Sequence, residues 1–229
     1  MQAQLTAQQV TAIQASFMNK VYAWMCLALT LTAFVAFRTA SSEAMMSIIL
    51  NPLVHFGLMI ILLGIVFWMS RSIATISSNT AIGYFLLFSA LMGLSLSVIF
   101  LVYTQASITS TFFVTAGMFG VMSVYGYFTK RDLSSIGNIL FMGLIGIILA
   151  SIVNAFMRSE TIYWIITYAG VVIFVGLTAY DTQKLRQLSL EINMESEMGR
   201  KGAIMGALTL YLDFINLFIF LIRILGERR

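Results

Sequence analysis

The sequence predicts an all-α, polytopic membrane protein that folds as one bundle of seven transmembrane helices. Of the 229 residues, 60% are hydrophobic and only 10% are charged, whereas soluble domains are about 45–50% apolar and roughly 25% charged. A chain with so few charges cannot cover its surface in water, so most of its surroundings must be lipid. The length suits one compact bundle rather than several domains.

Seven apolar stretches are long enough to cross a bilayer, because a transmembrane helix needs about 20 residues to span roughly 30 Å of hydrocarbon. The third and fourth are separated only by polar residues around Gln105, but together they are about twice as long as one crossing requires. The seven stretches are Val21–Phe37, Leu53–Ser70, Ala81–Tyr103, Ser107–Tyr127, Ile136–Met157, Ile162–Tyr180 and Ala203–Leu225.

The first twenty residues differ from the rest of the chain, being polar and rich in Gln, Thr and Ala. No basic segment followed by a short apolar run and a small-residue cleavage site is present there, so these residues do not resemble a secretory signal. They are predicted to form a short polar leader, 1–20, ahead of a single seven-helix membrane domain, 21–229. The first span would then act as its own membrane signal.

Basic residues in short loops mark the cytoplasmic side of a membrane protein, and here they favour a cytoplasmic N-terminus. The outside loops then hold only Arg38 and Arg158, although a tail with Arg223, Arg228 and Arg229 would also lie outside. A six-span alternative with a re-entrant last segment would return that tail to the cytoplasm, but the last stretch is long enough to cross. The basic residues placed inside are Lys20, Arg71, Lys130, Arg131, Lys184, Arg186, Arg200 and Lys201.

Nucleic acid and resident metals are not expected partners. The net charge is +4, yet the basic residues are scattered singly or in pairs rather than gathered into a phosphate-tracking patch. The chain has one cysteine, Cys26, and one histidine, His55, which makes a metal cluster implausible. No cofactor is therefore expected.

An enzyme is not expected either. Tyr180-Asp181 matches half of an intramembrane aspartyl protease signature, but Leu210-Tyr211-Leu212 stands where Gly-x-Gly should precede Asp213. The proline-containing element of those proteases is impossible, since Pro52 is the only proline. Hydrolase, metalloprotease and phosphate-loop motifs are absent from the sequence.

One acidic residue, Asp213, stands near the middle of the last apolar stretch, ten residues from its start at Ala203. An acid at the centre of a membrane helix costs about 2.5–3.5 kcal/mol, so a carboxyl group kept there is expected to face an aqueous cavity or a partner. Thr209 and Asn216 lie one turn away on the same face and can share its hydrogen bonds. A protonated acid bonded to a neighbouring helix is the structural alternative.

A second acid, Asp181, ends the sixth stretch. With a cytoplasmic N-terminus, the sixth helix descends to the cytoplasm and the seventh climbs back, so Asp213 lies about one to two turns deeper on the adjacent helix. If the carboxyl groups met, they would share a proton and titrate as a unit. Such a pair is a candidate pH sensor and gate, and its deprotonated oxygens suit transient binding of Ca²⁺. Alternatively, Asp181 pairs with Lys184 or lies in interfacial water.

Two strings around these acids resemble a known family. They are Gly176-Leu177-Thr178-Ala179-Tyr180-Asp181-Thr182-Gln183 and Leu208-Thr209-Leu210-Tyr211-Leu212-Asp213-Phe214-Ile215-Asn216-Leu217-Phe218. Both are similar to the Bax inhibitor-1 family, also called the transmembrane Bax inhibitor motif family. Gly117-Met118-Phe119-Gly120 and Lys130-Arg131-Asp132-Leu133 agree with its bacterial branch. The resemblance runs from about Phe17 to the C-terminus, and the string that contains Asp213 is its most specific part.

The resemblance implies a seven-helix bundle whose last helix is central, surrounded by the other six. It also implies a pH-sensitive calcium leak, with Asp181 and Asp213 as the pH sensor and gate and with Ca²⁺ as the permeating ion. The family places a basic residue at the cytoplasmic end of the second helix, where it can latch the sixth-helix aspartate. Arg71 is the candidate here, but Ser70 can also take the matching position, and a one-residue offset turns a helical side chain by about 100°.

The bacterial branch is also linked to a membrane-bound AAA protease, as a partner or regulator. The resemblance therefore leaves two functions open. One is a calcium (cation) leak channel gated by the coupled aspartates, and the other is a non-transporting membrane protein that modulates such a protease. The short leader and tight loops favour the bacterial branch, and hence the cell inner membrane.

Overall fold

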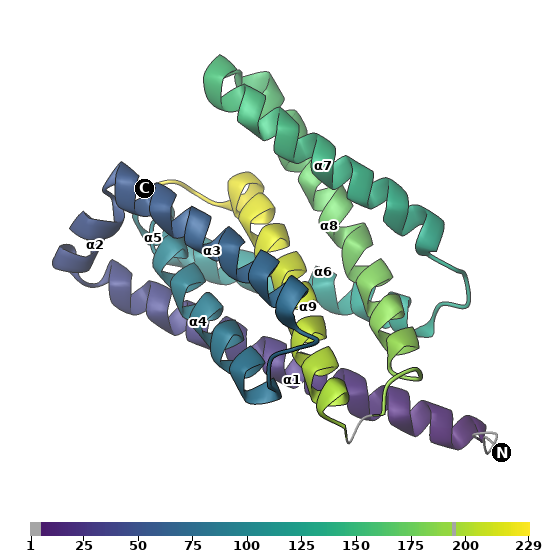
Figure 1. Ribbon diagram of the computed structural model, residues 1–229. Helices are drawn as coiled ribbons and strands as arrows, with labels where there is room; N and C mark the ends of the chain where they lie inside the picture. Colours follow the sequence, from purple (N-terminus) through teal and green to yellow (C-terminus); the bar gives the residue numbers. More distant parts are fainter. Residues whose placement is uncertain (1–5, 194–195) are drawn as a thin grey trace. The chain divides into compact units, whose positions relative to one another are not determined.

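The computed structural model describes residues 6–193 and 196–229, and α-helices are the only regular elements within this part of the chain (Figure 1). Seven crossings are long and apolar enough to span a membrane, which confirms the predicted fold class. The third crossing, Ser78–Val102, combines two consecutive helices. The helices are α1 Ala7–Ala40, α2 Glu43–Ile49, α3 Pro52–Ser72, α4 Ser78–Leu96, α5 Ile99–Val102, α6 Gln105–Phe128, α7 Ser134–Met157, α8 Glu160–Leu188 and α9 Glu197–Leu225.

Side-chain caps fix where several helices begin. The Ser77 side chain accepts the backbone N–H of Thr80 at the start of α4, and the Thr104 side chain accepts that of Ser107 at the start of α6. Such caps satisfy backbone donors that have no partner within the helix. The Thr104 cap therefore begins a new helix at Gln105, where the sequence predicts the break between the third and fourth crossings.

The first helix begins well before the predicted first span. α1 starts at Ala7 because Thr6 and Gln9 form a capping box, in which each side chain accepts the other's backbone N–H. Ala and Gln also favour helix intrinsically. Most of the predicted leader is thus helical and continuous with the first crossing, and Phe17 within it is buried. Hydropathy alone could not locate this boundary, because a capped polar helix has no apolar signal.

The chain forms two compact units. The first contains residues up to Val102 together with Leu185–Tyr211 and Arg229, and the second contains Tyr103–Lys184 and Leu212–Arg228. In the first unit, α1 and α3 both pack against α4. α1 and α4 approach closely at Gly93, where a Cβ atom would come within 2.6 Å of a carbonyl oxygen of α1.

A buried tyrosine organises the core of the first unit. The Tyr211 hydroxyl lies 2.7 Å from the Thr32 hydroxyl, which in turn donates to the backbone carbonyl of Ser89 at 2.8 Å. The Tyr211 ring meets the rings of Phe85 and Phe88 edge to face, with centroids 5.9 Å apart. Because the single Thr32 proton is used on Ser89, Tyr211 is the donor to Thr32. This chain of hydrogen bonds ties α9 to α1 and α4.

Replacing Tyr211 with phenylalanine should lower the free energy of unfolding by about 1 kcal/mol, because one buried hydrogen bond is lost while the ring packing stays. Thermal unfolding in detergent measures this change. Tyr168→Phe is the matched control, since the Tyr168 side chain is exposed, and it should unfold like the wild-type protein. A Tyr211→Phe variant that is as stable as the control would contradict the assigned hydrogen bond.

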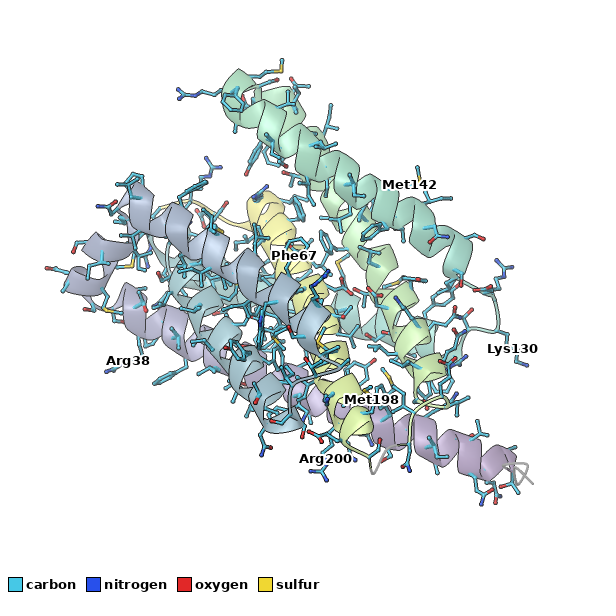
Figure 2. The ribbon with its side chains drawn as sticks, viewed as in Figure 1. Arg38, Phe67, Lys130, Met142, Met198 and Arg200 are labelled. Carbon is cyan, nitrogen blue, oxygen red and sulfur yellow. The ribbon has the colours of Figure 1, made fainter. Side chains whose placement is uncertain are left out.

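The second unit is built on α8 and the C-terminal half of α9. Its apolar core joins Ile166, Ile173, Phe174 and Leu177 of α8 to Leu217, Phe220 and Leu221 of α9, and α7 packs against this core from the outside. Figure 1 shows α7 running alongside α8. Of the seven crossings, α9 has the largest buried share and α7 the smallest. The Met142 side chain of α7, labelled in Figure 2, is 71% exposed, as expected of a helix that faces lipid.

Candidate functional site

The second unit brings two carboxyl groups together. Asp181 lies in the cytoplasmic-side half of α8 by the orientation inferred from sequence, and Asp213 lies in the middle of α9. The two side chains are hydrogen-bonded to each other. Asp213 is only 5% exposed and Asp181 is partly buried. The chain therefore holds an acid pair inside an apolar helix bundle.

A hydrogen bond between two carboxyl groups requires a proton on one of them, because an ionised carboxylate can only accept. The pair therefore holds at least one proton in this geometry. Lys184, one turn beyond Asp181 on α8, attracts the Asp181 carboxylate. The sequence left two partners open for Asp181, namely Asp213 and Lys184. In the structure, Asp181 is hydrogen-bonded to Asp213 and is also attracted by the Lys184 ammonium group.

Close helix contacts fix the segment that carries Asp181. Gly126 of α6 packs directly on the backbone of Ala179, and Gly137 of α7 packs directly on the ring of Tyr180. A Cβ atom at Gly126 would lie 2.9 Å from the Ala179 Cα atom, and one at Gly137 would lie 2.5 Å from the Tyr180 Cε2 atom. Two glycines therefore let α6 and α7 press against the two residues that precede Asp181.

Gln183 fixes the same segment from the other side of Asp181. Its side-chain oxygen accepts the backbone N–H of Leu133 at 2.9 Å, and its side-chain nitrogen donates to the Arg131 carbonyl at 2.8 Å. Both partners lie in the loop between α6 and α7. The buried amide thus ties that loop to α8 two residues after Asp181, which limits how far the carboxyl group can move without moving the loop.

Four buried oxygens of the second unit have no hydrogen-bond partner among the residues that the structure describes. One is the Oδ2 atom of Asp213, and the others are the hydroxyl oxygens of Thr111, Ser123 and Thr182. Buried polar atoms are nearly always satisfied by protein or by water. Each of these oxygens, from α6, α8 and α9, is therefore suited to bind a water molecule.

The buried hydroxyl groups of α6 were not predicted from the sequence. This helix buries hydroxyl side chains every four residues, interrupted by Phe119, and the four are Ser107, Thr111, Thr115 and Ser123. The signal was present as Ser and Thr repeating every four residues from Ser107. Such residues also suit ordinary helix packing in membranes, so the repeat alone does not identify a polar face.

Thr209 and Asn216, predicted to share the hydrogen bonds of Asp213, are hydrogen-bonded to backbone carbonyl groups instead. Thr209 donates to the backbone carbonyl of Met205 at 3.1 Å, and Asn216 donates to that of Leu212 at 2.8 Å. Both hydrogen bonds run back along α9, which is a common local arrangement for polar side chains in helices. Arg71 lies in the last turn of α3, where its side chain is exposed.

A third aspartate, Asp132, lies in the loop between α6 and α7, outside the membrane-spanning segments. Hydrogen bonds from the side chain and backbone of Ser134 hold the pKa of Asp132 below its ordinary value. A lowered pKa adds stability that is present above the unfolded-state pKa and is lost only as pH falls through the folded-state pKa. That window lies far below neutrality, so Asp132 stays ionised between pH 6 and 8.

Comparison with known proteins relates nearly the whole chain to one family. Residues 14–229 match the family model described as inhibitor of apoptosis-promoting Bax1. The chain is 55% identical over 216 residues to the inner membrane protein YbhL of Escherichia coli K12, covering 93% of this chain and 92% of that one. It is 45% identical over 223 residues to an uncharacterized protein of Borreliella burgdorferi, covering 97% and 96%. It is also 38% identical over 214 residues to an uncharacterized membrane protein of Streptococcus pyogenes serotype M1, covering 92% of each.

Proposed function

Because the chain belongs to the Bax inhibitor-1 family, we propose that it is a pH-sensitive cation leak channel, permeable to Ca²⁺, rather than an enzyme. The gate is the coupled pair Asp181 and Asp213. The observation that supports this most strongly is a hydrogen-bonded acid pair in which Asp213 Oδ2 is buried and has no hydrogen-bond partner among the described residues. A purely structural acid pair would be expected to satisfy all of its oxygens.

Protons control the gate because the hydrogen bond between the two carboxyl groups needs at least one of them. Losing the shared proton removes the hydrogen bond and leaves two like charges next to each other, which repel strongly where water is scarce. Gaining a second proton removes the negative charge that attracts a cation. Either change alters how α8 and α9 approach each other at Asp181 and Asp213, so the flux of ions through this region depends on pH.

Calcium suits this site as a passing ion rather than as a resident one. Ca²⁺ takes six to eight oxygen ligands, and two carboxylates supply at most four. Water molecules would supply the others. A site with so few charged ligands binds weakly enough to release the ion, as conduction requires.

The proposed location is the cell inner membrane, with the N-terminus in the cytoplasm. The Escherichia coli relative is named an inner membrane protein, and the distribution of basic residues in short loops supports this orientation. In this arrangement Asp181 lies toward the cytoplasmic side, so the pair responds first to cytoplasmic pH.

The direct test is calcium flux into vesicles that contain the purified protein and a calcium-sensitive dye. Flux above that of empty vesicles, changing several-fold between pH 6 and 8, is the expected result. Protein-containing vesicles that take up no more calcium than empty ones at any of these pH values would overturn the channel proposal.

The alternative is a non-transporting membrane protein that modulates a membrane-bound AAA protease. The exposed surface of α7, in which Gly137 alone is buried, offers room for such a partner as well as for lipid. Stoichiometric co-purification with the protease, together with no calcium flux, would favour this function over the channel.

A further inference from the structure

The arginines that break the positive-inside pattern gather in one place. Arg158, Arg223 and Arg228 lie on the outer side of the membrane in the inferred orientation, where basic residues are normally scarce. In the second unit they line one cavity of about 570 Å³, formed where α7 ends, α8 begins and α9 ends. Because basic residues are disfavoured on this side of the membrane, three arginines in one cavity indicate that their positive charge serves to bind a ligand.

The turn that carries Arg158 is held in an unusual conformation. Arg158 has a positive φ of 52° and is the one such non-glycine residue in the described part of the chain. Its backbone N–H donates to the Asn154 carbonyl at 2.7 Å, and the Asn154 side chain accepts the next backbone N–H, from Ser159, at 2.9 Å. Strained backbone of this kind is often found where a side chain must be aimed at a ligand.

Arg223 is positioned by aromatic rings rather than by a carboxylate. Its guanidinium group lies 5.4 Å from the centre of the Tyr163 ring and 5.2 Å from that of Phe220. Stacking holds the plane of a guanidinium while leaving its N–H edges free to donate. No carboxylate of the described residues forms an ion pair with Arg158, Arg223 or Arg228, so their donors remain available to a ligand.

The tail that carries Arg228 is also fixed. Glu227 donates its backbone N–H to the Ser107 hydroxyl at 3.0 Å and accepts the Thr104 backbone N–H at 3.1 Å. Tyr103 and Arg228 form an isolated bridge beside these contacts. The cavity lining contains three arginines and one acid, Glu160, so its net charge is positive.

We propose that this cavity binds a phosphate-bearing anion, held by the guanidinium groups of Arg158, Arg223 and Arg228. Planar guanidinium groups match phosphate oxygens in charge and geometry. The cavity lies at the ends of three crossings, where phospholipid headgroups are found. Trp164 also lines it and stacks on Tyr168, as aromatic side chains do at the membrane interface. Phe156 and Ile165, close in the chain to residues that line the cavity, have exposed apolar side chains that suit contact with acyl chains.

The test compares lipid binding by the full-length protein in detergent, using native mass spectrometry and thermal unfolding. The probes are phosphatidylglycerol, diacylglycerol with the same acyl chains, and inorganic phosphate. Phosphatidylglycerol should bind and stabilise the wild-type protein more than diacylglycerol does. Arg223→Gln should weaken its binding about tenfold, as expected for the loss of one charge-assisted contact.

Arg38→Gln is the matched control, because Arg38 is an exposed arginine that lies on the same side in the inferred orientation and does not line the cavity. It should bind phosphatidylglycerol like the wild-type protein. Arg158→Gln provides a second test with little risk to folding, since this side chain is exposed, and it should also weaken binding.

The arms of the experiment separate the two sources of phosphate. Stabilisation by inorganic phosphate that is lost in Arg223→Gln would assign the site to a free anion, and an effect limited to phosphatidylglycerol would assign it to lipid. Equal binding of phosphatidylglycerol and diacylglycerol, or equal binding by the wild-type, Arg223→Gln and Arg158→Gln proteins, would overturn the proposal.

Discussion

Replacing Asp213 with asparagine is expected to remove most of the pH dependence of calcium flux. A gate that titrates as one proton can change its open fraction by up to about tenfold per pH unit. Asparagine has nearly the same size and can still hydrogen-bond to Asp181, but it cannot gain or lose a proton in this range. The flux of Asp213→Asn should therefore differ by less than about twofold between pH 6 and 8. Dye-loaded vesicles measure both proteins under identical conditions.

Asp132→Asn is the control for this experiment. Asp132 is ionised throughout the same pH range because Ser134 holds its pKa below the ordinary value, and it lies outside the membrane-spanning segments. Its replacement should leave the pH profile of flux unchanged. A profile in Asp213→Asn that matches those of Asp132→Asn and the wild-type protein would exclude Asp213 from the gate.

Replacing Gly126 with alanine is expected to destabilise the second unit and to disturb the segment that carries Asp181. The added Cβ atom would overlap the Ala179 carbonyl group and lie 2.9 Å from the Ala179 Cα atom. These are backbone atoms, so a change of rotamer cannot relieve the contact and α6 must move away from α8. Overpacking of this kind costs about 1–3 kcal/mol. Thermal unfolding in detergent measures the loss, and vesicle flux reports whether the gate is altered.

Gly120→Ala is the matched control on the same helix, because a Cβ atom at Gly120 meets nothing within 4 Å. This variant should be as stable as the wild-type protein or slightly more stable, since alanine favours helix over glycine. If the two variants unfold at the same temperature, the close approach of α6 and α8 at Gly126 is not present in the protein.

Hydropathy was sufficient to predict the crossings. The predicted fold class, the seven spans and the break near Gln105 are all confirmed. They were predictable because a helix that crosses lipid needs an unbroken run of apolar residues. The start of α1 was not predictable in the same way, since it depends on the Thr6–Gln9 capping box. The resemblance carried by the strings around Asp181 and Asp213 is confirmed by the family match over residues 14–229.

The candidate site was predictable only in part. Asp181 and Asp213 are predicted on adjacent helices from the sequence, and the structure joins them by a hydrogen bond. Helix geometry could not decide the roles of Thr209 and Asn216, because a polar side chain in a helix can bond its own backbone as easily as a neighbour one turn away. The hydroxyl groups of α6 and the arginine cavity depend on tertiary packing, which brings together residues that are far apart in the chain.

The most direct test of the coupled gate is the pH profile of calcium flux in Asp181→Asn, Asp213→Asn and the double variant. Two carboxyl groups that share one proton act as a unit, so each single replacement should remove as much of the pH dependence as both together. Two independent groups would instead make separate contributions that add up in the double variant. An additive result, or a pH profile that survives in the double variant, would contradict the proposed proton-sharing pair.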